Sequence, residues 1–165
     1  MSTKTDYTPE EWKAIAGAPV AAGLYITLAD ASGPVGITKE AMAVGKAITN
    51  SAAADAPEIV RAIAESVKSG GGRPELPDVP KTDVAQMKLA LQGRLQDALG
   101  AVAAKSPDEA EAFRKWLLSV ATNVAQASKE GGFLGIGGTV VSPEEQVALE
   151  ELAGALSSWG PATAS

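Results

Sequence analysis

The chain has 165 residues, no cysteine, no histidine and a formal net charge of −6 at pH 7. This length fits one domain of ordinary size. The missing residue types exclude disulfides, thiol chemistry, and the commonest general base and metal ligand.

The excess of acidic residues argues against a nucleic-acid partner and against adsorption to an anionic membrane. No apolar run approaches the roughly 18 residues of a membrane span. The first residues, MSTKTDYTPEEW, also lack the apolar core of a signal peptide. From these features we expect a cytoplasmic protein that binds neither nucleic acid nor membrane.

Three helix starts share one pattern, in which a hydroxyl residue is followed by Pro and two acidic residues, at Thr8, Ser106 and Ser142. The hydroxyl can accept a hydrogen bond from a free N–H of the first turn, and Pro suits the first helical position because no bond is lost there. The acidic residue three positions after the hydroxyl can bind back to the cap, which completes a capping box. We therefore interpret these acidic residues as structural and not as a catalytic cluster.

From these starts and from the positions of Gly and Pro, the sequence predicts an all-α fold, a compact bundle of six or seven helices. The predicted helices cover residues 9–16, 19–30, 38–50, 57–69, 82–104, 107–130 and 143–157. The fifth and sixth carry clear apolar stripes, such as Val84, Met87, Leu91 and Leu95 in the fifth. Because only a short turn around Ser106 joins these two helices, we expect a long antiparallel hairpin.

The second predicted helix, PVAAGLYITLADA, is apolar almost all round. Such a helix is usually buried, and we expect it at the centre of the bundle. The alternative is an interface helix in a homodimer. Tyr25 and Asp30 are among its few polar residues. Asp30 could have a shifted pKa beside a buried helix, or it could form local turn bonds near the helix end.

The stretch SGGGRPELPDVPK at residues 69–81 is too rich in Gly and Pro for regular structure. We interpret it as a crossover linker within a single helical domain at residues 1–158, and the alternative is an extended docking segment. Residues 159–165 are small and polar, which predicts a flexible tail.

The stretch GGFLGIGGT at residues 131–139 differs from a phosphate-binding loop mainly because Gly138 replaces the lysine. A phosphate loop also needs a preceding strand and a helix that begins at once, and here the preceding segment is predicted helical. We therefore exclude a nucleotide site. The apolar residues Phe133, Leu134 and Ile136 predict a glycine-rich loop that packs onto the bundle before the last helix, and the alternative is a partner-binding surface.

Two stretches of the chain resemble a group of small bacterial helical proteins of no established function. They are YTPEEWKAIAGAPVAAGLYITLADASGPVGITKEA and KEGGFLGIGGTVVSPEEQVALEELAGAL, of which the loop KEGGFLGIGG is the most specific element. The resemblance implies an all-helical fold and a bacterial source. It implies no activity and no site residues.

No catalytic, cofactor-binding or metal-ligating residue is predicted, and no cofactor is expected. The residues that we single out as an interaction or ligand surface are Tyr25, Asp30, Phe133, Leu134 and Ile136. The leading hypothesis is a non-catalytic interaction or structural protein, whose partner is a second copy of the chain or another protein. One alternative is a carrier or sensor of a small apolar ligand held between helices, and a further alternative is an enzyme without a recognisable motif.

Overall fold

A computed structural model describes residues 3–29, 44–50, 56–69, 83–129 and 141–158. Every regular element in these residues is helical, which confirms the all-α prediction. The elements are the short 3-10 helix η1 (Lys4–Asp6) and the helices α1 (Pro9–Thr27), α3 (Glu58–Lys68), α4 (Val84–Lys105), α5 (Pro107–Lys129) and α6 (Pro143–Ser157). Residues 44–50 are helical as well.

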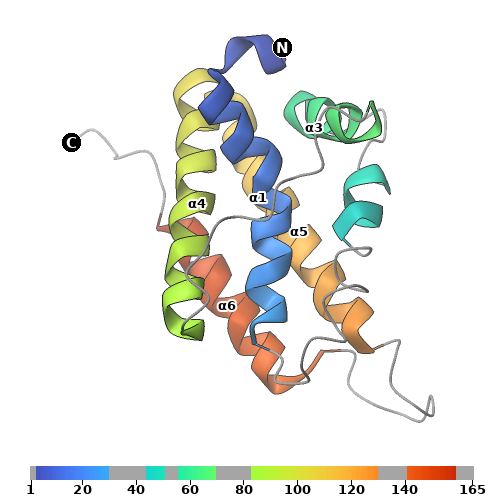
Figure 1. The fold of residues 1–165 in the computed structure, drawn as a ribbon, viewed down its shortest axis with the longest axis vertical. Coiled ribbons are helices and arrows are strands. Elements are labelled where there is room, and N and C mark those ends of the chain that lie inside the picture. The colour runs from blue at the N-terminus through green and yellow to red at the C-terminus, as the bar shows by residue number, and fades with distance from the viewer. Residues whose placement is uncertain (1–2, 30–43, 51–55, 70–82, 130–140, 159–165) are drawn as a thin grey trace.

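The helices α1, α4, α5 and α6 alternate in direction along the length of the bundle (Figure 1). The helix α1 contacts each of the other three, and α4 packs against α5 as the predicted antiparallel hairpin. The helix α3 packs on α5 near the end of the bundle that holds the α4–α5 turn. That end and the opposite one, where α4 and α6 begin, carry the side-chain clusters described below.

The helix α1 is one continuous element, so the predicted break between residues 16 and 19 is wrong. Pro19 lies inside the helix and is itself buried. An interior proline costs roughly 3 kcal/mol because it removes a backbone hydrogen bond and crowds the preceding turn. Burial of the surrounding segment, including Ala18, Ala21 and Ala22, opposes this cost. The prediction that this apolar segment lies buried within the bundle is confirmed for its described part, which ends at Ala29.

Two of the three predicted capping boxes are confirmed. The Thr8 hydroxyl accepts from the Glu11 N–H at 3.2 Å, and the Thr8 N–H donates to the Glu11 carboxylate at 2.7 Å. Ser142 and Glu145 exchange the same pair of bonds at 3.2 and 2.8 Å. These reciprocal bonds satisfy backbone donors that a helix start would otherwise leave open, and they set where α1 and α6 begin.

The third predicted capping box, at Ser106, stays a prediction, and the residues of this start also bond to other helices. Ser106 also ends α4, and its N–H donates to the Val102 carbonyl at 2.6 Å. The Glu109 carboxylate crosses to α3 and accepts from the Glu58 N–H at 2.9 Å. An acidic residue in the first turn of α5 therefore caps the start of a different helix.

We expect Glu109→Ala to lower the free energy of unfolding by about 1 kcal/mol, a typical cost of losing a helix cap. Asp108→Ala is the matched control, because Asp108 lies in the same first turn and is exposed. Chemical denaturation followed by circular dichroism measures both variants. Equal effects would mean that the helix dipole of α5, and not the cap on α3, explains the loss.

The core contains the inward faces of all these helices. From α4 it takes Leu91, Leu95, Ala98, Leu99 and Val102, and from α5 it takes Phe113, Leu117, Val120, Ala121 and Val124, all at most 1% exposed. The predicted apolar stripes are therefore confirmed, with one exception at the start of α4. Val84 is 49% exposed there and lies outside the core.

Gly23 lies where α1 is packed tightly against its neighbours. A Cβ atom at this position would overlap Cγ2 of Val44 and lie 3.3 Å from Cγ2 of Val124. Valine side chains are short and stiff, so they cannot swing aside as a longer chain would. Gly17, in the same helix, has no such neighbour within 4 Å.

Gly23→Ala should therefore destabilise the fold by about 1–3 kcal/mol through overpacking, although alanine favours helices. Gly17→Ala is the matched control and should stabilise the protein by up to about 1 kcal/mol through helix propensity alone. Thermal and urea denaturation report both changes. A stabilising effect of Gly23→Ala would contradict the close packing.

Candidate functional site

Of the five residues predicted as an interaction or ligand surface, Tyr25 lies in the described part of the chain. Asp30, Phe133, Leu134 and Ile136 fall outside it, as do the linker after Ser69 and the tail at 159–165. The predictions made for those residues therefore stay predictions. The candidate site is built around Tyr25.

Tyr25 lies in the last turns of α1 and is 1% exposed. Its hydroxyl donates to Oε2 of Glu151 on α6 at 3.1 Å and accepts from Nε2 of Gln92 on α4 at 2.9 Å. Lys88, one turn before Gln92, donates to the same Glu151 oxygen at 2.8 Å. The Lys88 ammonium also lies 5.0 Å from the centroid of the Tyr25 ring. These four residues, which we call the Tyr25 cluster, join three helices.

The environment keeps the Tyr25 phenol neutral. Burial raises its pKa to about 12, and the hydrogen bond to the Glu151 carboxylate and its negative charge act in the same direction. The hydrogen bond from Lys88 lowers the pKa of Glu151, with a smaller contribution from the Tyr25 hydroxyl. At neutral pH the cluster therefore contains a neutral phenol, a carboxylate and an ammonium group.

This arrangement suits a structural role, in which hydrogen bonds join three helices, better than proton transfer. The Tyr25 hydroxyl donates a hydrogen bond to Glu151 and accepts one from Gln92. A general acid or base works best when its pKa lies near the operating pH, and a phenol with a pKa of about 12 is far from neutrality. The cluster holds α1, α4 and α6 in a fixed relation at one end of the bundle.

Sequence reasoning did not single out Lys88, Gln92 or Glu151. The i, i+4 spacing of Lys88 and Gln92 places both on one face of α4, but this spacing is common on surface helices. Glu151 is 126 residues from Tyr25 in the chain, and no local pattern links the two. Only the packing of α6 beside α1 and α4 brings them together.

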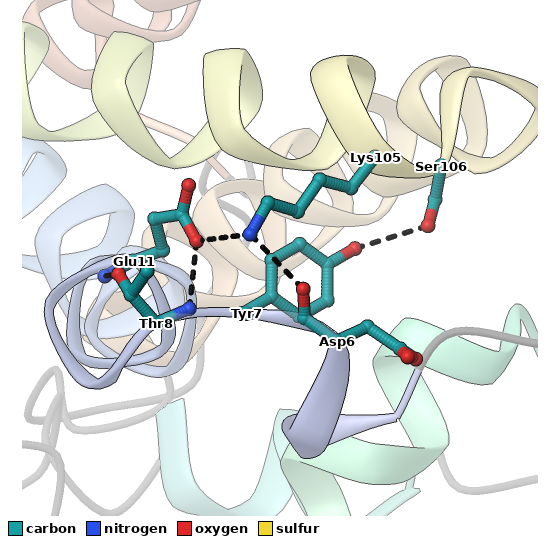
Figure 2. A network of polar contacts seen from close by, with 6 residues as sticks. All are labelled: Asp6, Tyr7, Thr8, Glu11, Lys105 and Ser106. Atoms are coloured by element: carbon teal, nitrogen blue, oxygen red, sulfur yellow. Dashed lines mark hydrogen bonds and ion pairs between the residues drawn. The ribbon is translucent and has the colours of Figure 1, made fainter.

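A second cluster lies at the opposite end of the bundle, where the chain begins and α4 turns into α5 (Figure 1), and Figure 2 shows its residues. The Lys105 ammonium donates to the Asp6 carbonyl at 3.0 Å and to Oε2 of Glu11 at 2.7 Å, and it lies 5.6 Å from the centroid of the Tyr7 ring. The Tyr7 hydroxyl donates to the Ser106 hydroxyl at 3.1 Å. Both clusters thus place a lysine of α4 over a tyrosine ring and pair that lysine with a glutamate.

Large apolar side chains are exposed in the first half of two helices, α4 and α6, that begin at the same end of the bundle. Among the described residues they are Val84 and Leu89 in α4 and Val147 in α6, at 49, 64 and 53% exposure. The starts of α4 and α6 lie at the same end of the bundle, together with the last turn of α1 (Figure 1). We call Val84, Leu89 and Val147 the apolar end.

The described part of the chain holds no group of three or more acidic residues that could bind a metal ion. Within the same residues, no helix is both long enough and apolar enough to cross a bilayer.

No family model, curated protein or solved structure matches the chain. The resemblance noted from the sequence therefore stays a prediction, and function is inferred from the residues themselves.

The raised pKa of Tyr25 makes a measurable prediction at high pH. Between pH 10 and about 12 the unfolded chain loses the Tyr25 proton, whereas the folded chain keeps it. The phenol therefore contributes to the free energy of unfolding fully below pH 10, and this contribution is lost as the pH rises to about 12. In a titration followed by tyrosinate absorbance, the difference between wild type and Tyr25→Phe should therefore have its midpoint near pH 12. A difference centred near pH 10, the ordinary value for tyrosine, would contradict the enclosed hydrogen-bonded phenol.

Proposed function

We propose that the chain is a non-catalytic helical interaction protein of the cytoplasm that associates through the apolar end. Exposure of Leu89 is the observation that carries the proposal, because at 64% it is the most exposed of the large apolar side chains in the described residues. Single exposed apolar residues are common on protein surfaces, but a group at one end of a bundle is typical of a contact surface.

The Tyr25 cluster supports this proposal because it fixes the helices that present these side chains. Lys88 lies next to Leu89 on α4, and Glu151 lies one turn after Val147 on α6. Their ion pair at 2.8 Å holds the two helices together at the level of the apolar end. A surface held in one arrangement loses less conformational entropy on binding than a mobile one.

The apolar loop with Phe133, Leu134 and Ile136 enters the proposal from its sequence alone. It connects α5 to α6 in the sequence, and the described end of α5 and the start of α6 lie at the same end of the bundle as the start of α4 (Figure 1). Stable protein interfaces bury about 800 Å² on each partner, which is more than three scattered side chains supply. We therefore include the loop in the proposed contact.

The proposal is tested by self-association. Analytical ultracentrifugation over a wide concentration range should show a dimer of the wild type. Leu89→Glu and Val147→Glu should each weaken it by about tenfold or more, because each places a charge in an apolar contact. Ala104→Glu is the control, since it adds the same charge at an exposed position at the other end of α4 and should leave the dimer unchanged.

A wild type that stays monomeric at every concentration would refute self-association. Native mass spectrometry then distinguishes the remaining hypotheses. A monomer that retains a small apolar molecule would favour the carrier. A bare monomer that gains no partner in its own cell extract would refute the interaction function as a whole.

A further inference from the structure

The segment before α1, residues 3–8, lies against the turn that joins α4 and α5, and we call it the strap (Figure 2). Its short helix η1 contains no buried residue. Tyr7 is the one strap residue that is buried, at 6% exposure. Apart from Tyr7 the strap buries no side chain, so one aromatic ring and a few polar contacts hold it in place.

Lys105 contacts the strap directly at two residues and also binds the α1 carboxylate that caps its end. Its ammonium binds the Asp6 carbonyl and Oε2 of Glu11, and it lies over the Tyr7 ring. The same Glu11 oxygen accepts the Thr8 N–H at 2.7 Å, which is the bond that joins the strap to the first turn of α1. One charge from α4 thus acts on three consecutive strap residues.

Tyr7 makes the remaining attachment and covers part of the core. Its hydroxyl donates to Ser106 at 3.1 Å, and its ring contacts Trp12 with centroids 6.2 Å apart. Trp12 is 6% exposed. Release of the strap would withdraw the Tyr7 ring from Trp12 and expose an aromatic surface at this end of the bundle.

We propose that the strap detaches from the α4–α5 turn while the helices stay folded. We propose further that the positive charge of Lys105 keeps the strap attached. The Lys105 and Glu11 side chains are 34 and 31% exposed, so salt reaches and screens their pair. Tyr7 is the one strap residue in the core cluster, and the other buried members of that cluster lie in helices, so opening of the strap removes a single side chain from it. Local opening of a weakly buried segment needs far less free energy than global unfolding.

Hydrogen exchange measured by mass spectrometry tests the proposal on the full chain. In Lys105→Met, which keeps an apolar stem and removes the charge, the amides of residues 6–8 should exchange about tenfold faster or more, because charge-assisted bonds are lost. Peptides from α4 and α5 should keep their wild-type rates. Lys105→Arg keeps the charge and should stay within about twofold of wild type in the strap.

Salt provides a second readout that a purely structural lysine would not produce. In 1 M NaCl the wild-type strap should approach the exchange rates of Lys105→Met, while the variant itself should not respond, because its ion pair is already gone. Unchanged strap exchange in Lys105→Met would overturn the proposal. Faster exchange of all helices by the same factor would also overturn it, since the lysine would then support global stability.

Discussion

The burial of α1 against α4, α5 and α6 is the constraint on which the other features of this protein depend. The middle of α1 is built from small residues, so neighbouring side chains approach its backbone closely, and Gly23 has no room for a Cβ atom. This packing removes apolar surface from water on all four helices and opposes the local cost of Pro19. It also fixes the course of α1, so that Tyr7, just before its start, and Tyr25, near its end, lie at opposite ends of this helix.

The two lysine–tyrosine–glutamate clusters differ in what they enclose. Tyr25 is buried between three helices, and its hydroxyl both donates and accepts a hydrogen bond. Its removal from the core would therefore require the helices to separate. Tyr7 belongs to a short segment without other buried residues. The same residue types therefore make a permanent cross-link at one end and a contact that we propose to be releasable at the other. The amount of apolar surface around each tyrosine accounts for the difference.

Local chemistry was enough to predict most of the helices. The hydroxyl-Pro-acid starts placed α1, α5 and α6, and the apolar stripes identified the α4–α5 hairpin. Prediction failed where a tertiary contact overrides a local preference. Pro19 continues a helix because the segment around it is buried. Glu109 accepts from the Glu58 N–H of α3, a contact between helices that the local pattern does not predict. Neither contact can be inferred from spacing along the chain.

The sequence by itself determined the helical class, the starts of the capped helices and the burial of the segment around Tyr25. It also excluded thiol and histidine chemistry, because those properties depend on composition and on neighbours within a few residues. Only the tertiary structure decided the partners of Tyr25, which are Gln92 and Glu151, and the contacts of Lys105 with the strap. These residues lie 67 to 126 positions apart, and they meet because packed helices bring distant turns to the same level of the bundle.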